Sequence, residues 1–232
     1  MKYTKQNPSE DYLSLAEQYR LLYSTEGGSL ANGTKRAPKE MFANGEYGKE
    51  APVIKRLMDK NDCRSLINFG CGNPDAFFVK PYIDKTIVQK DDKGNKMSPV
   101  HDSVYDYLGR PYVVMYDPGI EELSEYPTFP GEMVVCTDVL EHIPAQDIPW
   151  FLDELFNLTT KVLHVTIHLG PAVTFLPDGR NAHVTVRPRD WWYQQIEAAK
   201  KRASHQIHVN TVMRYPVDKK GNYVNIDYSQ YT

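Results

Sequence analysis

Four short apolar runs along the chain have the composition of buried parallel strands. Apolar side chains dominate each run without strict alternation, which is the pattern of a strand covered on both faces. The runs are Leu66–Phe69, Val113–Tyr116, Met133–Cys136 and Val162–Ile167. Apolar residues recur at helical spacing in four other segments, 9–26, 51–60, 148–156 and 189–196. Helical segments that alternate with such strands predict an α/β fold with a mostly parallel central sheet and helices on both faces.

The two ends of the chain add further elements to this plan. His208–Met213 and Tyr223–Ile226 flank a turn at 218–222, which predicts an antiparallel hairpin at the C-terminus. Residues 29–50 are rich in glycine, asparagine, lysine and alanine, which indicates a loop. Together with the preceding helix, the segment 1–50 is either a lid over a site or a cover for one edge of the sheet.

The middle of the chain is longer than a compact sheet requires. Between the first two strands, residues 81–110 are expected to form an insertion. Its charged stretch 90–96 lies between two apolar segments, which is typical of a hairpin tip or of a disordered loop exposed to solvent. The segment from 118 to 132 is short and rich in proline, so it leaves little room for a further helix and strand. A single domain over 1–232 is expected.

The first strand runs directly into a glycine turn. Gly70 and Gly72 allow a sharp turn and the close approach of a ligand, because a Cβ atom is absent there. Asn73 is expected to cap the following helix and Pro74 to be its first residue. A strand, a glycine turn and a helix N-terminus in this order indicate a site for a nucleotide-like cofactor, although an ordinary connection without a ligand has the same pattern.

Asp117 ends the second strand and precedes Pro118 and Gly119. Because parallel strands end at the same edge of a sheet, its carboxylate is expected beside the glycine turn, where it can accept hydrogen bonds from both hydroxyls of a ribose. The alternative is that Asp117 only caps the Pro-Gly turn, since aspartate is common before turns.

The stretch from Asn68 to Gly72 resembles the first motif of class I S-adenosylmethionine-dependent methyltransferases, with Asn68 in place of the usual acid and Pro74 in place of a common third glycine. Thr137–Pro144 closely resembles the segment after the fourth strand in many of these enzymes. The resemblance implies a Rossmann-like methyltransferase fold, S-adenosylmethionine as cofactor, and methyl transfer to oxygen or nitrogen. The cofactor-binding residues that it implies are Asn68, Gly70, Cys71, Gly72, Asp117, Thr137 and Asp138. The chain is also similar to methyltransferase-like proteins of tailed phages.

A second candidate site follows from the spacing of Asp138, Glu141 and His142. At i, i+3 and i+4 these side chains share one face of a helical turn, where they can ligate a divalent metal ion if His183 completes the set. Small-RNA 3′-end 2′-O-methyltransferases and ubiquinone-pathway O-methyltransferases have similar segments that hold a metal. The alternative is that Asp138 contacts the cofactor or caps the helix, while Glu141 and His142 bind neighbouring loops. Without a metal, His142 and His183 are the candidate catalytic bases.

Composition and charge limit the expected partners and cellular compartment of the protein. The chain has 232 residues, 41% of them hydrophobic and 25% charged, which is enough for a real core. A net charge of −3 gives no overall attraction to nucleic acid or to anionic membranes, although it leaves room for a local basic patch. Three cysteines without metal-like spacing, no apolar N-terminal leader and no membrane-length apolar run predict a cytoplasmic protein, in the host cytoplasm if it is encoded by a phage.

Two other functions remain open at this stage. A nicotinamide-dependent oxidoreductase is disfavoured because Asp75, in the expected first helical turn, repels a pyrophosphate. A protein that binds S-adenosylmethionine without catalysis stays open because Asn68 replaces the usual acid. The sequence does not identify the methyl acceptor, which is either a small molecule or a nucleic acid.

Overall fold

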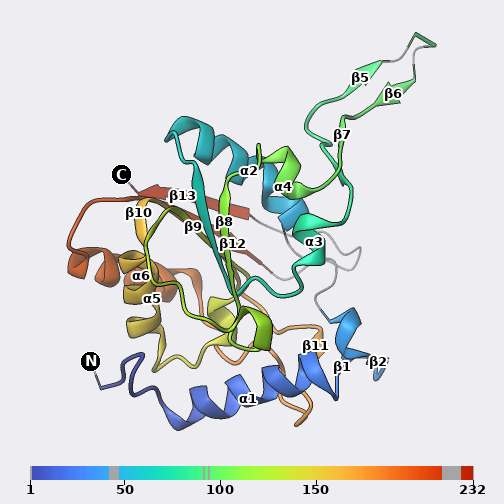
Figure 1. Cartoon of the computed structure of the whole chain (residues 1–232). Coiled ribbons are helices and arrows are strands. Elements are labelled where there is room, and N and C mark those ends of the chain that lie inside the picture. The colour runs from blue at the N-terminus through green and yellow to red at the C-terminus, as the bar shows by residue number, and fades with distance from the viewer. Residues whose placement is uncertain (1, 42–46, 91, 94, 216–225, 232) are drawn as a thin grey trace.

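The computed structural model of the chain describes residues 2–41, 47–90, 92–93, 95–215 and 226–231. Its centre is a six-stranded sheet in the order β13-β12-β10-β9-β3-β8 (Figure 1). Within this sheet β3, β8, β9, β10 and β12 run parallel, and β13 is antiparallel to its neighbour β12. Their bounds are β3 (Ser65–Phe69), β8 (Tyr112–Tyr116), β9 (Gly131–Thr137), β10 (Thr159–His168), β12 (His208–Arg214) and β13 (Ile226–Tyr231).

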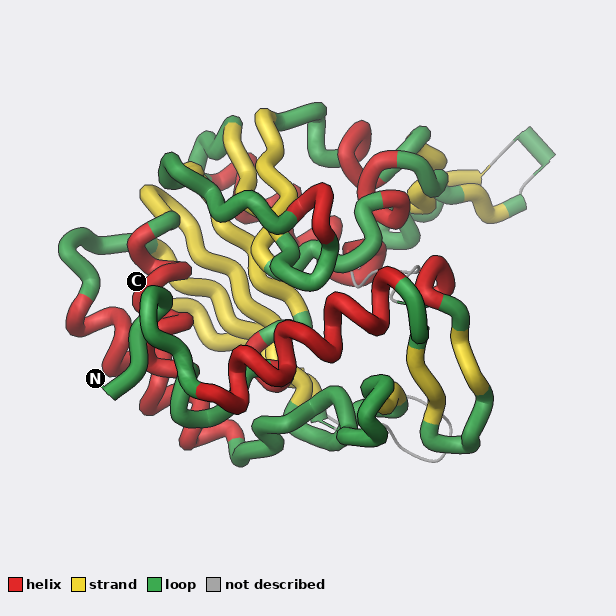
Figure 2. Tube along the Cα trace, turned by 60° about the horizontal axis from the view of Figure 1, so that its bottom comes forward, coloured by secondary structure: helices red, strands yellow, loops and turns green. Residues whose placement is uncertain are grey.

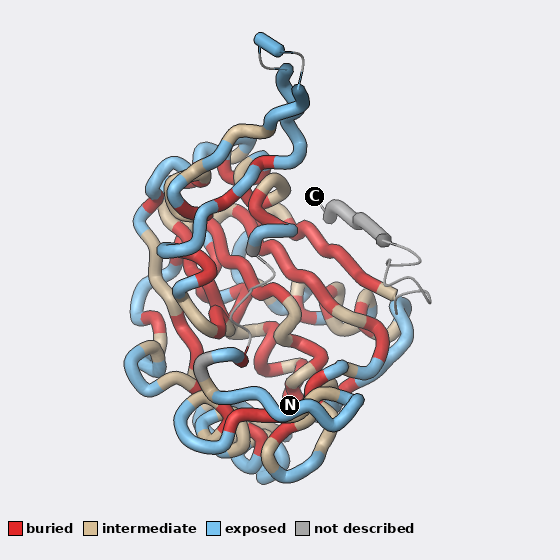
Figure 3. The backbone as a smooth tube through the Cα atoms, turned by 90° about the vertical axis from the view of Figure 1, so that its right-hand side faces the viewer, coloured by how far each residue is buried: buried red, intermediate tan, exposed pale blue. Residues whose placement is uncertain are grey.

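Helices cover both faces of this sheet, so the domain has three layers. One face carries α5 (Ile148–Asn157) and α6 (Arg189–Arg202), and the other carries α2 (Tyr47–Lys60) with the short helices α3 (Asp75–Phe78) and α4 (Val104–Tyr107). Along β9, Val134 and Cys136 belong to the core under α5, whereas Met133 and Val135 belong to the core under α2. The central strands are therefore buried on both sides, as Figure 3 shows. This architecture is compatible with a Rossmann-like fold, and it confirms the predicted α/β fold with a mostly parallel central sheet and helices on both faces.

The order of the strands places a topological switch point beside β3. The next strand of this sheet along the chain, β8, pairs with one edge of β3, and the one after it, β9, pairs with the other edge. A crevice therefore opens at the carboxyl ends of these strands, where open α/β sheets bind ligands. Between β8 and β9 the chain forms only a short 3₁₀ helix, η2 (Glu121–Leu123), so the short proline-rich segment adds no strand to the sheet.

The N-terminal helix α1 (Glu10–Ser24) lies across this carboxyl edge (Figure 2). The hydroxyl of Ser9 caps it by accepting the N–H of Tyr12, as serine does at helix starts. The expectation of a plain loop after this helix is wrong. Strands β1 (Gly28–Leu30) and β2 (Lys35–Arg36) pair with each other, β1 also pairs with β11 (Thr174–Phe175), and a 3₁₀ helix, η1 (Pro38–Glu40), follows.

The predicted insertion forms a ribbon that projects from the body of the domain (Figures 1 and 3). At its base β4 (Tyr82–Ile83) pairs with β7 (Val100–His101), and farther out β5 (Gln89–Lys90) pairs with β6 (Lys96–Met97). The pairing of β5 with β6 confirms the hairpin expected there. We call residues 79–101 the arm.

The C-terminal antiparallel pair is confirmed with a shifted second strand. β12 pairs with β13 antiparallel, and Arg214 lies opposite Ile226. The strand predicted at Tyr223–Ile226 and the turn predicted at 218–222 lie, apart from Ile226, outside the described residues. Within the described part of the chain, every helix is too short or too polar to traverse a lipid bilayer.

Candidate functional site

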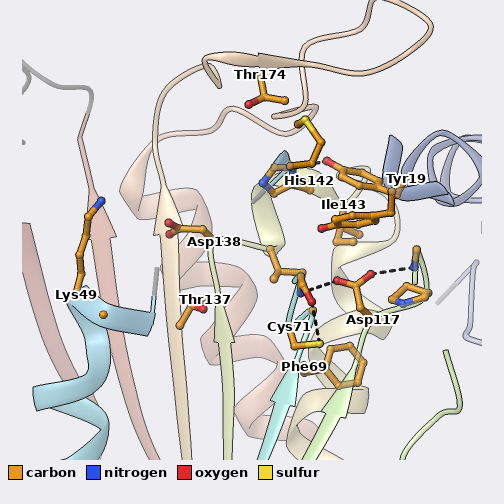
Figure 4. Close-up of a pocket in the computed structure, with 18 of the residues that line it drawn as sticks. Tyr19, Lys49, Phe69, Cys71, Asp117, Thr137, Asp138, His142, Ile143 and Thr174 are labelled. Atoms are coloured by element: carbon orange, nitrogen blue, oxygen red, sulfur yellow. Dashed lines mark hydrogen bonds between the residues drawn. The ribbon is translucent and has the colours of Figure 1, made fainter. Parts of the chain in front are cut away.

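A cavity of about 990 Å³ opens at the switch point of the sheet. It is bounded by α1, by the ends of β3, β8 and β9, by the start of α2 and by the base of the arm (Figure 4). Tyr12, Leu15, Tyr19 and Tyr23 give α1 an apolar and aromatic face toward the cavity. The N-terminal helix is thus one wall of the site, as a lid would be.

The glycine turn forms the floor of the cavity. Gly70 and Gly72 have φ angles of 74° and 57°, in the left-handed region that favours glycine. A Cβ atom on Gly70 would lie 2.5 Å from Cγ2 of Val139, so only glycine fits against the segment after β9. The N–H groups of Gly70 and Cys71 both donate to the carbonyl of Tyr116, which ties the turn to the end of β8.

Asp117 joins the glycine turn to the second strand. Its Oδ2 accepts the N–H of Gly72 at 2.9 Å, and its Oδ1 accepts the N–H of Gly119 at 2.9 Å. Burial raises the pKa of Asp117, and the two backbone donors counteract that shift. The carboxylate therefore does cap the Pro-Gly turn, but each oxygen has a second lone pair, and the residue lines the cavity.

Asp138 begins the segment after β9 in a left-handed conformation, with φ at 53°. Its N–H donates to the carbonyl oxygen and to Oγ1 of Thr166, and Thr166 Oγ1 donates back to Asp138 Oδ1 at 2.8 Å. Arg214 donates to Asp138 Oδ2 at 3.0 Å. These bonds stabilise a backbone conformation that is rare outside glycine. They hold Asp138 at the wall of the cavity.

A buried polar network continues from Arg214 beneath the cavity. Its guanidinium also donates to Glu50 at the start of α2. Glu50 is bonded to His164 Nε2 at 3.0 Å, and His164 Nδ1 is bonded to Asn210 at 2.9 Å. Burial opposes ionisation of Glu50, but its bond with His164 and the charge of Arg214 hold its pKa below its ordinary value. The network therefore joins α2, β10 and β12 to Asp138.

The predicted metal ligands divide into two groups. Ligand atoms of Glu141, His142 and His183 lie within 4.8 Å of one another. Asp138 is not part of this cluster, so the expectation that it shares a helical face with Glu141 is wrong. The 3₁₀ helix η3 comprises only Leu140–His142, and the positive φ of Asp138 directs its side chain toward Arg214 instead.

Glu141 is fully buried beneath the cavity. Its Oε1 accepts the N–H of His168 at 2.7 Å, while no described residue forms a hydrogen bond with its Oε2. Burial, and after it the charge of Asp138, raises the pKa of Glu141 well above its ordinary value. A buried carboxyl oxygen without a partner beside two imidazoles fits a divalent cation, which would supply the missing interaction.

The two histidines of the cluster are oriented by neighbouring groups. Tyr19 OH is bonded to His142 Nδ1 at 2.5 Å, and His183 Nδ1 donates to the carbonyl of Gly170 at 2.6 Å. The second bond leaves Nε2 of His183 as the acceptor, the arrangement usual for a metal-ligating histidine. Burial, and then the neighbouring His183, lowers the pKa of His142 to about 3, and burial lowers that of His183 to about 4. Both rings are neutral near pH 7.

His168, at the end of β10, is a further histidine near this cluster. Its ring centroid lies 5.2 Å from that of His183, and its Nδ1 accepts the N–H of Gly170 at 3.2 Å. The rule that placed Asp117 at the carboxyl edge also places His168 there. No local sequence pattern indicated that Tyr19, Glu50 and Arg214 belong to the site, since they contact it from distant parts of the sequence.

The predicted cofactor residues are found at the cavity with one exception. Those that line it are Gly70, Cys71, Gly72, Asp117, Thr137 and Asp138. Asn68 does not line it. Its side chain is fully buried within the sheet, and neither amide atom has a hydrogen-bond partner among the described residues. His142 lines the cavity, whereas His183 lies behind it.

No protein-family model matches the sequence, and no curated protein is significantly similar to it. The geometry of the cavity therefore has to carry the functional assignment.

Proposed function

We propose that this protein is an S-adenosylmethionine-dependent methyltransferase of the class I type that acts on an oxygen or nitrogen nucleophile. The observation that carries the proposal is the meeting of the Gly70–Gly72 turn and Asp117 on the floor of a switch-point cavity. The lone pairs of Asp117 that do not accept backbone N–H groups suit the two hydroxyls of a ribose. The turn lets the nucleoside approach the backbone closely.

The geometry at α3 favours this donor over a dinucleotide. α3 comprises only the four residues Asp75–Phe78, so it offers little helix dipole to a pyrophosphate. The prediction of Asn73 as the N-cap and Pro74 as the first helical residue is wrong by one position: Pro74 is the N-cap, and the side chain of Asn73 accepts the N–H of Asp75 in the turn before the helix. Asp75 is exposed and does not line the cavity. The shortness of α3 therefore supports S-adenosylmethionine over a dinucleotide more than the charge of Asp75 does.

The reaction would be an in-line displacement at the donor methyl group, for which the protein aligns the two substrates and accepts a proton from the acceptor. Among the candidate bases, His142 is the one that lines the cavity, and its lowered pKa keeps its ring neutral near pH 7. The Tyr19 hydroxyl fixes the orientation of its ring. His183 stands behind it with a ring-centroid distance of 4.7 Å.

Glu141, His142 and His183 would hold a divalent ion if the enzyme uses one, with His168 next to them. Mixed nitrogen and oxygen ligands suit manganese, iron, cobalt or zinc at least as well as magnesium. Such an ion lowers the pKa of an acceptor hydroxyl and orients it. An acceptor with neighbouring hydroxyls would suit this chemistry.

Titration calorimetry with S-adenosylmethionine, S-adenosylhomocysteine and NAD tests the choice of cofactor. We expect both sulfur nucleosides to bind and NAD not to bind. Asp117→Ala should weaken binding of S-adenosylhomocysteine by well over tenfold, because each charged hydrogen bond contributes about 1.5–3 kcal/mol. Asp190→Ala, at an exposed position in the first turn of α6, is the matched control. Unchanged affinity in a folded Asp117→Ala protein, or binding of NAD alone, would refute the assignment.

Turnover with labelled donor separates the enzyme from a protein that only binds the nucleoside. If the metal takes part, EDTA should abolish turnover and added Mn²⁺ should restore it. Glu141→Ala and His183→Ala should then remove activity while affinity for S-adenosylhomocysteine changes little. Full turnover in the chelator would leave His142 as a simple general base.

A further inference from the structure

The mouth of the cavity is lined by cations from three separate segments. Arg36 comes from β2, Lys49 from the first turn of α2, and Lys85 from the base of the arm. All three residues are exposed. Figure 4 shows Lys49 on the opposite side of the cavity from Asp117, so this cation stands well away from the proposed ribose site.

The described carboxylates near this mouth accept hydrogen bonds from other groups of the protein. Glu40 also lines the cavity, but its Oε2 accepts the N–H of Ala37. Asp138 accepts from Arg214 and Thr166. Asp84, next to Lys85 in the sequence, is 2% exposed, and its Oδ1 accepts the backbone N–H and the hydroxyl of Thr86. Arg36, Lys49 and Lys85 are exposed cations that an anionic acceptor meets at this mouth, although the whole chain carries −3.

The arm extends this basic character away from the cavity. Its base supplies Pro81–Ile83, Lys85 and Thr86 to the cavity wall, and its outer strands project into solvent (Figure 1). Residues 79–101 contain five lysines and three aspartates, one of which is the buried Asp84. Exposed apolar side chains stand between these charges, namely Ile87, Val88, Met97 and Val100. A two-stranded ribbon of this kind is only marginally stable by itself, so a partner that covers it would order it further.

The cavity is large for a small-molecule site. Its 990 Å³ lies at the upper limit of about 1,000 Å³ for a single small-molecule pocket. A nucleoside donor on the glycine turn would leave space toward Lys49 and Lys85 for an acceptor group of similar size. A group that enters there has cations around its point of entry and the arm leading away from it.

We propose that the methyl acceptor is a single-stranded nucleic acid. One nucleotide enters the cavity beside the donor, its flanking phosphates contact Arg36, Lys49 and Lys85, and the strand continues along the arm. A single strand suits this mouth because an unpaired nucleotide enters a pocket without the cost of unstacking and unpairing a duplex. The role as acceptor rests on the proposed methyltransferase function, whereas binding of the strand does not.

Fluorescence anisotropy with a labelled 20-nucleotide RNA, and with DNA of the same sequence, tests this proposal. We expect the full chain to bind a single strand more tightly than the corresponding duplex. Three phosphate contacts at the mouth should give a slope of log K against log salt of about −2 or steeper. The difference between the two probes shows whether the sugar is recognised.

Charge-reversal variants locate the binding surface. Arg36→Glu and Lys85→Glu should each lower affinity for the oligonucleotide by about tenfold and flatten the salt dependence. Lys201→Glu, at an exposed position near the end of α6, is the matched control and should change affinity less than twofold. Equal effects of Lys85→Glu and Lys201→Glu would show non-specific attraction and refute the proposal.

A shortened arm provides the second test. Replacing residues 88–97 by Asn-Gly retains the pairing of β4 with β7 and removes the outer strands. This variant should bind S-adenosylhomocysteine like the unaltered protein but lose at least tenfold in affinity for the oligonucleotide and in methyl transfer to it. Undiminished oligonucleotide binding would refute the role of the arm, and no oligonucleotide binding by the unaltered protein would refute the proposal as a whole. Oligonucleotide binding without any affinity for S-adenosylhomocysteine would instead refute only the proposed function.

Discussion

Arg214→Met is the substitution whose effect follows most directly from the structure. Arg214 is 3% exposed in β12, and its guanidinium bridges two carboxylates, those of Glu50 and Asp138. Methionine retains an unbranched apolar stem in the same strand but removes the cation. Breaking a buried ion pair by removing one partner destabilises a protein by about 3–5 kcal/mol, because it leaves a charge buried without compensation. We expect a loss in this range at pH 7 from urea unfolding.

The dependence of this loss on pH distinguishes charge from packing. In the unaltered protein the pKa of Glu50 lies below its ordinary 4.5, so Glu50 stabilises the fold above that pH and loses its contribution as the pH falls through the lowered pKa. Without Arg214 the pKa of Glu50 should rise, and protonation on acidification then relieves the penalty. The difference in unfolding free energy between the two proteins should therefore shrink from pH 7 toward pH 4.

The double variant Glu50→Gln/Arg214→Met completes the test. It removes one of the two carboxylates that lose their partner, so it should be more stable than Arg214→Met alone, with a coupling energy of about 0.5–3 kcal/mol. Binding of S-adenosylhomocysteine should weaken in Arg214→Met, since Asp138 loses a partner that holds it at the cavity wall. A loss of less than about 1 kcal/mol, or the same loss at both pH values, would refute an electrostatic role for Arg214.

Three other substitutions test the walls of the cavity. Gly70→Ala should lower the free energy of unfolding, measured in urea, by about 1–3 kcal/mol or more, because the φ of Gly70 is 74° and the added Cβ would lie 2.5 Å from Val139. Recovery of stability on adding Val139→Ala would assign the loss to this clash, and unchanged stability of Gly70→Ala would contradict it. Tyr19→Phe should lower the maximal methyl-transfer rate more than affinity for S-adenosylhomocysteine, because it removes the hydroxyl bonded to His142, and an unchanged rate would exclude that role. Because Leu22 is fully buried, Leu22→Ala should destabilise the protein by about 2–5 kcal/mol in urea unfolding and make α1 sensitive to proteolysis. A protease-resistant α1 in this variant would show that other contacts hold the helix in place.

Much of the fold could be predicted from the sequence because its signals are local. The continuous apolar runs at Leu66–Phe69 and Val162–Ile167 predicted buried strands, since a strand covered on both faces has no polar side to show. Gly70, Gly72 and Asp117 could be assigned to one edge of the sheet because parallel strands end together. The expected β5–β6 hairpin and the cap at Ser9 follow from equally local rules.

Only the tertiary structure decided which side chains meet. Asp138 and Glu141 suit a helical turn by spacing, but Thr166 and Arg214 hold Asp138 in a left-handed conformation. The cluster of Glu141, His142 and His183 forms without it. Residues 29–36 have the composition of a loop, yet β1 finds a partner strand in β11, about 145 residues later. The bond between Glu50 and Arg214 joins positions that no local pattern relates. Spacing along the chain determines the elements, whereas the packing of distant segments determines the environment, conformation and charge state of each side chain at the site.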